Sequence, residues 1–293
     1  MSTFTTRTPI LKGWSSDKKY RVTTEDGGTY LLRVSSADGY DRRAAEFAFA
    51  KRVAALGVPM CRPVELGRCE EGICSLWEWI DGEDAEAVIP TRPASEQYRY
   101  GVESGRILQL IHRIPAPANA EPWESRFTRK LDRKLALYAA CPLRYEGGDA
   151  FVGYIEGNRH LLSGRPQVCQ HGDYHIGNFM LDCTGALRVI DFNRFDFGDP
   201  WEEFNRIVWC AGASPAFATG MVDGYFDVSA DGEVPAGFWA LLAFYIASNT
   251  LSSLPWAIPF GDGEIQTMRH QAAEVLDWYN GMTCIVPTWY RRP

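Results

Sequence analysis

Residues Gln170 to Phe197 read QHGDYHIGNFMLDCTGALRVIDFNRFDF, and this stretch decides how the chain is interpreted. Its first half places Asp173 after a His-Gly pair and Asn178 five residues after that aspartate. Its second half is an apolar-rich segment, expected to be a strand, that ends at Asp191. One carboxylate able to take a proton and two oxygen ligands for a hard cation are what phosphoryl transfer requires. We therefore expect a phosphoryl-transfer site here.

The three side chains divide into two roles. Magnesium usually takes only one or two protein oxygens and leaves its other positions to water and phosphates, a demand that Asn178 and Asp191 meet. Asp173 is the candidate base that orients an acceptor hydroxyl. Protein kinases have the same spacing in H-R-D-x-x-x-x-N followed by D-F-G. In this chain Gly172 replaces the arginine and Asn193 replaces the final glycine, which argues against a protein kinase.

The pattern H-G-D-x-H-x-G-N followed by I-D-F resembles the aminoglycoside phosphotransferase family, small-molecule kinases with a protein-kinase-like fold. The resemblance extends downstream to the D-x-x-R, (G/A)-D and later acidic positions of that family. It implies that Asp173 is the catalytic base and that Asn178 and Asp191 bind Mg²⁺. It also implies structural support of the catalytic loop by four residues: His171, Arg194, Asp199 and Glu203.

This stretch also allows two other interpretations. Asp173 and Asn178 are residue types that often form turns, although their joint spacing with Asp191 favours a site. His171 and His175 are four residues apart, which would suit a zinc hydrolase if both lay on one helix face. Glycines at 172 and 177 argue against a helix, and no third ligand set is evident. His171 is interpreted as a structural hydrogen-bonding residue, and His175 has no assigned role.

The first eighty residues are expected to hold the nucleotide. Residues 20–23 and 29–34 flank a Glu-Asp-Gly-Gly turn and predict a β-hairpin. The polar loop ahead of it, residues 12–18, lies where kinases cover the phosphates, and Ser15 and Ser16 are its candidate phosphate contacts. It matches neither G-x-G-x-x-G nor G-x-x-x-x-G-K-[ST], so this signal is weak.

Arg33 lies where protein kinases carry a phosphate-pairing lysine. A charged residue in an apolar strand needs a partner, and Glu46, on a helix predicted over residues 41–56, is the hypothesis. A surface arginine with an unrelated glutamate is the alternative. A strand over residues 74–80 then leads to a hinge at residues 78–81, where backbone groups would bind adenine, so the candidate contacts are Glu78, Trp79 and Ile80.

Beyond the hinge the pattern is mostly helical, with helices expected over residues 95–114, 124–140, 150–162, 201–210, 215–226, 235–252 and 263–280. A β-rich front and an α-rich back predict a bilobal α+β fold. The expected lobes are 1–81 for the nucleotide and 82–293 for catalysis and the acceptor, with the active site in the cleft.

Charge separates the two expected lobes. Residues 1–81 hold 12 Lys and Arg against 11 Asp and Glu, so the chain totals of 30 and 37 leave 18 against 26 for residues 82–293. The balances are +1 and −8. Acidic surfaces attract cations and repel anions, which favours a cationic hydroxylated small molecule and argues against a nucleic acid. The candidate ammonium contacts are Asp149, Glu156, Glu202, Asp223 and Asp277.

Composition indicates a soluble, folded, cytoplasmic protein. The N-terminus lacks the features of a secretion signal, and no run of about 18 apolar residues predicts a membrane span. The eight cysteines form no C-x-x-C pair, so reduced thiols are expected. The oligomeric state is not predicted.

The leading hypothesis is an ATP-dependent O-phosphotransferase that uses Mg²⁺ and phosphorylates a cationic small molecule, with aminoglycoside antibiotics as the acceptor class that the resemblance implies. GTP in place of ATP stays open. One rival is a metabolic kinase with a choline-like or amino-sugar acceptor. Another is a pseudokinase, a nucleotide-binding module without turnover, which Arg33 and the missing glycine loop suggest.

Overall fold

The chain folds into two compact units in a computed structural model, which describes residues 3–11, 17–228 and 232–293. The sheet unit comprises Met1–Ala85 and Asn178–Asn193, and the helical unit comprises Glu86–Gly177 and Arg194–Pro293. A β-rich unit followed by a mostly helical unit confirms the predicted α+β class. The loop carrying Ser15 and Ser16 lies largely outside the described residues.

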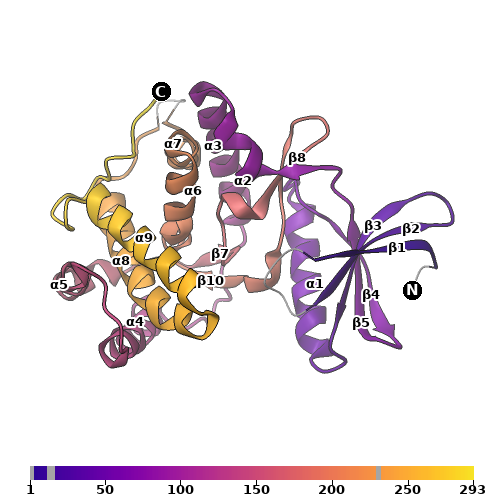
Figure 1. Ribbon diagram of the computed structural model, residues 1–293, viewed down its shortest axis with the longest axis horizontal. Helices are drawn as coiled ribbons and strands as arrows, with labels where there is room; N and C mark the ends of the chain where they lie inside the picture. The colour runs from indigo at the N-terminus through magenta and orange to yellow at the C-terminus, as the bar shows by residue number, and fades with distance from the viewer. Residues whose placement is uncertain (1–2, 12–16, 229–231) are drawn as a thin grey trace. The chain divides into compact units, whose positions relative to one another are not determined.

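The sheet unit is built on a five-stranded antiparallel sheet with strand order β1-β2-β3-β5-β4 (Figure 1). Its strands are β1 Phe4–Ile10, β2 Lys18–Thr24, β3 Thr29–Ser35, β4 Pro63–Cys69 and β5 Gly72–Glu78. Helix α1, Tyr40–Ala55, packs on the sheet through Phe47, whose ring meets that of Trp77 edge-on. The predicted hairpin and the predicted first helix are both confirmed.

A second, three-stranded sheet enlarges this unit. The hairpin of β8, Phe179–Asp182, and β9, Leu187–Val189, pairs with β6, Gly82–Asp84. Val189 also donates its N–H to the carbonyl of Pro59 at 2.9 Å, and Cys61 donates to the carbonyl of Val189. The structure thus differs from the predicted boundary at residue 81, because these backbone bonds attach the hairpin to the sheet unit.

The helical unit is arranged around the long buried helix α8, Ala236–Ala257, against which three helices pack: α4 Trp123–Ala140, α5 Gly148–Asn158 and α9 Asp262–Trp278. It also holds two short paired strands, β7 Val168–Gln170 and β10 Asp196–Gly198. The helices are α2 Ala85–Val88, α3 Ala94–Ile111, α4 Trp123–Ala140, α5 Gly148–Asn158, α6 Ile207–Ala213, α7 Pro215–Tyr225, α8 Ala236–Ala257 and α9 Asp262–Trp278. The 3-10 helices include η2 Arg159–Leu162, η4 Phe192–Arg194 and η5 Glu202–Arg206.

Helices α3 and α7 pack closely because each has two glycines one turn apart at the contact. A Cβ atom added at Gly101 would lie 2.1 Å from the carbonyl oxygen of Phe217, and one at Gly224 would lie 2.1 Å from that of Val102. Backbone therefore lies directly on backbone, and only glycine fits there.

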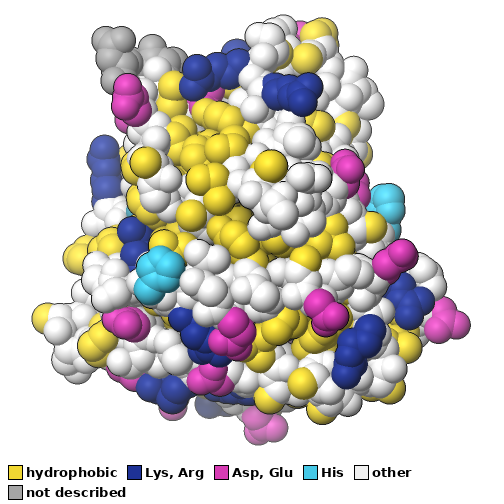
Figure 2. Space-filling model, turned by 90° about the vertical axis from the view of Figure 1, so that its left-hand side faces the viewer, with side chains coloured by type: hydrophobic (Ala, Val, Ile, Leu, Met, Phe, Trp, Pro, Cys, Tyr) yellow, Lys and Arg dark blue, Asp and Glu magenta, His cyan; other side chains and the backbone are white. Residues whose placement is uncertain are grey.

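Helix α8 is apolar enough in composition, and long enough, to cross a membrane. Its candidate span, Ala236–Phe260, has a mean hydropathy of 1.2, and 67% of the best window is buried in the protein. Core helices of soluble proteins have the same character. Hydrophobic side chains also gather among charged ones on the face of the protein that Figure 2 shows.

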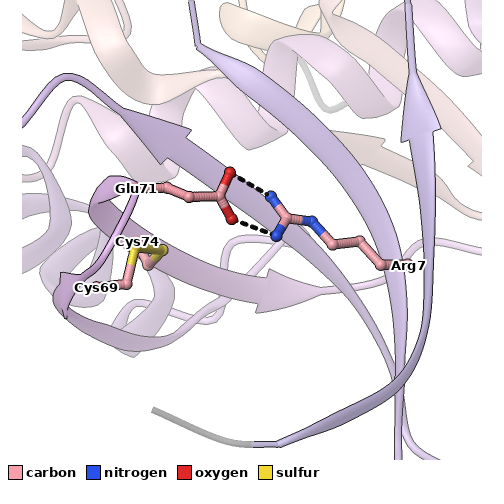
Figure 3. The surroundings of a disulfide bond; sticks show 4 residues. All are labelled: Arg7, Cys69, Glu71 and Cys74. Carbon is pink, nitrogen blue, oxygen red and sulfur yellow. Dashed lines mark hydrogen bonds and ion pairs between the residues drawn. A yellow bond between two sulfur atoms is a disulfide. The ribbon is translucent and has the colours of Figure 1, made fainter.

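One expectation about the cysteines is wrong. Cys69, at the end of β4, and Cys74, on β5, form a disulfide with 6.1 Å between their Cα atoms (Figure 3). The short turn between the strands brings the two residues into diagonal positions, since Cys69 pairs with Gly72 and Cys74 with Gly67. Arg7 of β1 holds the same turn through an ion pair with Glu71. The other six cysteines are free thiols.

We expect reduction of this disulfide to lower the free energy of unfolding by about 2 kcal/mol, because a short closed loop removes roughly that much chain entropy from the unfolded state. Urea unfolding with and without dithiothreitol measures the difference. Cys284→Ser, which removes an exposed free thiol, should respond to the reductant as the wild type does. Cys69→Ser should not respond. Equal midpoints for the wild type in both conditions would contradict the expectation.

Candidate active site

The two candidate metal ligands lie at the same end of the β8–β9 hairpin. Ile190 donates its backbone N–H to the carbonyl of Asn178 at 3.0 Å, so the residue before β8 and the residues after β9 are neighbours. Asp191 has φ of 67°, a left-handed conformation that aspartate tolerates better than most residues. Such conformations concentrate at functional sites. The hairpin therefore presents one amide and one carboxylate together.

Arg33 has two carboxylate partners, and Glu46 is neither of them. Its guanidinium lies 3.1 Å from Asp17 and 3.2 Å from Asp191. The predicted Arg33–Glu46 pair is therefore wrong. Glu46 instead binds Arg43 at 2.8 Å, three residues away on the same helix, and Arg43 reaches the other oxygen of Asp17 at 2.8 Å.

These contacts form a chain of alternating charges that ends at the candidate metal ligand. Asp17 is only 3% exposed and lies between the two arginines, so it fills the place expected for Glu46. A buried carboxylate with two guanidinium partners offsets part of its desolvation cost. The network orients Arg33 toward Asp191.

Lys19 is a second cation beside Arg33 that the sequence did not point to. It is paired with Arg33 across β2 and β3. Burial lowers the pKa of the Lys19 ammonium and the neighbouring Arg33 lowers it further, while Asp191 and Asp17 oppose this. Two adjacent cations near Asp191 suit the phosphates of a nucleotide, because phosphate oxygens bind both arginine and lysine side chains.

The donor set of the hairpin fits a hard divalent cation. Amide and carboxylate oxygens are the ligands that Mg²⁺ uses, and two from the protein are enough. Asn178 and Asp191 would hold the ion, and it would neutralise phosphate charge. Among the described residues no group of three or more His, Cys, Asp and Glu side chains is arranged to hold a metal, including His171 and His175, so the zinc interpretation has no support there.

Asp173, the candidate base, lies in the helical unit among positively charged groups. Arg206 approaches one carboxylate oxygen at 3.4 Å and Arg194 the other at 3.5 Å. The His175 Nε2 atom lies 3.8 Å from the first oxygen. The carboxylate is 18% exposed, so it is mostly shielded from bulk water but accessible to a reactant.

The protonation states of this group suit a base. Burial raises the pKa of Asp173, but Arg206, His175 and Arg194 together outweigh burial and hold it below its ordinary value. Burial lowers the pKa of His175 to about 4, so this imidazole is neutral at pH 7. Its Nδ1 atom accepts the N–H of Gly177 at 3.2 Å, which leaves the proton on Nε2, facing Asp173.

Short contacts hold the loop around Asp173. Glu203, 2% exposed, accepts the N–H of Gly172 at 3.0 Å, and the buried His171 accepts the N–H of Asp173 at 3.3 Å. Gly172 has φ of 84°, and a Cβ atom there would lie 2.0 Å from the carbonyl oxygen of Arg194. Only glycine fits this position. The supporting roles of His171, Arg194 and Glu203 remain predictions.

Asp199 is fully buried and is the centre of a polar network. Its carboxylate receives two bonds from Arg165, at 2.6 and 2.9 Å, and one from the hydroxyl of Tyr245 at 2.7 Å. It also accepts the N–H of Trp201 at 2.9 Å, and the Arg165 guanidinium lies over the Trp201 ring. The predicted supporting residue is thus part of the core of the helical unit.

The predicted adenine contacts lie where β5 ends. The backbone N–H of Glu78 already donates to the carbonyl of Arg62 at 2.8 Å, and its carbonyl accepts from the Cys61 thiol. Trp79 lies under the Arg21 guanidinium. The roles of Glu78, Trp79 and Ile80 remain predictions.

The five candidate ammonium contacts fall into two groups. Glu202 and Asp223 are buried and bound by the protein's own donors: Lys130 and Gln170 bind Glu202, and Arg292 with two tyrosine hydroxyls binds Asp223. The other three are on the surface, and Glu156 pairs with Arg159 at 2.7 Å. Asp149 and Asp277 are exposed.

Sequence analysis missed Asp17 and Arg206. Asp17 lies within the polar loop of residues 12–18, where an isolated acidic residue is ordinary. Arg206 stands three residues after Glu203, and residues three apart lie on the same side of a helical turn. This spacing could have indicated that Arg206 lies near the catalytic loop.

Comparison with known proteins gives the family. The family model described as "Phosphotransferase enzyme family" matches residues 6–238. A search of curated proteins finds no match.

Solved structures resemble the whole chain at low sequence identity. A choline/ethanolamine kinase family protein from Mesorhizobium loti has a TM-score of 0.67 at 16% identity, over 96% of this chain and 92% of that one. A thermostable mutant of aminoglycoside phosphotransferase APH(4)-Ia, bound to ADP and hygromycin B, scores 0.67 at 14%, over 94% of each. The amicoumacin kinase hAmiN, bound to AMP-PNP, Ca²⁺ and Ami, scores 0.62 at 15%, over 95% and 90%. With its protein-kinase-like α+β fold, the chain belongs to the phosphotransferase enzyme family.

Proposed function

We propose that this phosphotransferase transfers a phosphoryl group from ATP to a hydroxyl of a cationic small molecule, with aminoglycoside-type antibiotics as the leading acceptor class. The observation that carries the proposal is the side-by-side placement of Asn178 and Asp191, with Arg33 and Lys19 nearby. These four groups suit a metal–nucleotide complex. Asp173, ionised at neutral pH, supplies the base.

The residues divide the chemistry among them. Asp173 orients the acceptor hydroxyl and takes its proton. Asn178 and Asp191 hold Mg²⁺, which would neutralise charge on the phosphates when bound. The solved relatives hold ADP, AMP-PNP and Ca²⁺, and this supports a nucleotide with a divalent cation here. GTP is the alternative donor.

The acceptor is proposed to be cationic because residues 82–293 carry a net charge of −8. The groups next to Asp173 are positive, however, so the reacting hydroxyl should lie on a part of the acceptor without an ammonium group. Of the five candidate ammonium contacts, Asp149, Glu156 and Asp277 lie on the surface. A choline-like or amino-sugar acceptor is the second candidate, which the choline/ethanolamine kinase relative favours.

An acceptor panel tests this proposal. We expect ADP release that depends on an aminoglycoside, with a mass gain of one phosphoryl group in the product. N-acetylation of the acceptor's amines should lower kcat/KM about tenfold or more, the equivalent of about 1.4 kcal/mol. Asp173→Asn protein serves as the blank for ATP hydrolysis. Turnover of choline or an amino sugar, with none on any aminoglycoside, would replace the antibiotic proposal by the metabolic one.

The proposed location is the cytoplasm, which supplies ATP and Mg²⁺. The cytosol usually keeps thiols reduced, so the redox state of the Cys69–Cys74 pair in the cell tests this location. Thiol trapping of the protein before lysis measures their state. Complete resistance of both cysteines to alkylation would argue for an oxidising compartment.

A further inference from the structure

The short 3-10 helix η5, Glu202–Arg206, contacts the loop around Asp173 twice. Glu203 accepts the N–H of Gly172, the residue just before Asp173. Arg206, three residues later, places its Nε atom 3.4 Å from a carboxylate oxygen of Asp173. One element thus controls both the backbone that carries the carboxylate and the carboxylate itself.

This element is anchored independently of Asp173. Glu202, 8% exposed, is bound by Lys130 at 3.2 Å and by Gln170 at 3.0 Å. The side chain of Phe204 is fully buried, and the amide of Asn205 donates to the carbonyl of Glu202 at 2.6 Å. The start of the Arg206 side chain is therefore rigidly placed, and the side chain as a whole is 27% exposed.

We propose that Arg206 is a positioning residue for the base: its guanidinium orients the Asp173 carboxylate and keeps it ionised, ready for the acceptor hydroxyl. Arg194 on the opposite oxygen is 55% exposed, so Arg206 is the better-shielded partner, and charge interactions are stronger where water is excluded. The inference rests on the proposed role of Asp173 as base.

Several other titratable groups lie near Arg206 and Asp173. The cationic forms of His171 and His175, together with Arg194, also lower the pKa of Asp173. Lys134 of α4 interacts electrostatically with Arg206, and also with Lys130 and Glu202. Burial, with Lys130, lowers the pKa of Lys134 to about 7, and Glu202 opposes this. Lys134 and Arg206 repel each other, whereas the Asp173 carboxylate attracts the Arg206 guanidinium.

The test compares Arg206→Met and Arg206→Lys with the wild type by kcat and KM as a function of pH. Arg206→Met should lower kcat about tenfold, as a misplaced reacting group does, with KM for ATP changed by less than about twofold. The acidic limb of its kcat–pH profile should move to higher pH by about one unit, because an aspartate that loses an arginine partner binds its proton more tightly. Arg206→Lys keeps the charge and should keep the wild-type acid limb.

Three results would overturn the inference. They are an unchanged rate and acid limb in Arg206→Met, a loss of rate without movement of the limb, and the same movement in Arg206→Lys. Arg129→Met is the matched control, since within the described part of the chain this arginine of α4 has the exposed Glu121 as its one side-chain partner, and the substitution should change neither quantity. Circular dichroism confirms folding of each variant. If Asp173→Asn kept full activity, the proposed base would fail instead, and the two failures are thus distinguishable.

Discussion

Asp173→Asn is expected to lower kcat by about 10²- to 10⁴-fold, the range that a positioned general base contributes. The asparagine amide has the same shape but cannot take the hydroxyl proton. The effect should fall on kcat, because the groups proposed to bind the nucleotide, Asn178, Asp191 and Arg33, belong to the sheet unit. Steady-state rates with the acceptor, and calorimetric titration with Mg-ATP, separate the two quantities.

The matched control for this substitution is Asp132→Asn. Asp132 also pairs with an arginine of the helical unit, Arg159 at 2.8 Å, but it is 57% exposed and belongs to α4, not to the loop around Asp173. It should retain the wild-type rate. If Asp173→Asn turned over as fast as Asp132→Asn, Asp173 would not be the catalytic base. A wild-type protein that binds Mg-ATP but phosphorylates no acceptor would support the pseudokinase alternative.

Local patterns predicted the fold well where a few neighbouring residues decide the structure. The Glu-Asp-Gly-Gly turn does place β2 against β3, with Gly27 at φ of 85° as such turns require. The spacing of apolar residues over 41–56 is confirmed by α1. The motif around Asp173, Asn178 and Asp191, with the acidic and basic positions downstream of it, also predicted the family, which the match to residues 6–238 confirms.

Contacts between distant residues could not be predicted in this way. Arg33 and Asp191 are 158 residues apart, and no periodicity links them. Glu46 was a reasonable partner for Arg33 by position on its helix, but Arg43 is nearer to it and Asp17 nearer to Arg33. The register of β4 against β5 brings the thiols of Cys69 and Cys74 together. Because β4 was not predicted from the sequence, the disulfide could not be predicted either.

Asp199→Ala should lower the free energy of unfolding by about 3–5 kcal/mol, the effect of removing one member of a buried ion pair. The substitution leaves Arg165, the Tyr245 hydroxyl and the Trp201 N–H without their acceptor. None of them gains enough water to compensate, since the carboxylate site is fully buried. Domains are stable by about 5–15 kcal/mol, so the variant would be close to unfolding.

Urea unfolding followed by circular dichroism measures this effect against two comparisons. Glu156→Ala breaks a surface pair with Arg159 and should cost at most about 1 kcal/mol. Arg165→Met in the Asp199→Ala background should restore part of the lost stability, because the penalty comes from the uncompensated guanidinium rather than from the missing attraction. If Asp199→Ala cost no more than Glu156→Ala, the buried network would not stabilise the helical unit. If the double variant were less stable than Asp199→Ala, the packing of Arg165 on Trp201 would outweigh its charge, since the guanidinium lies only 3.8 Å from the ring centre.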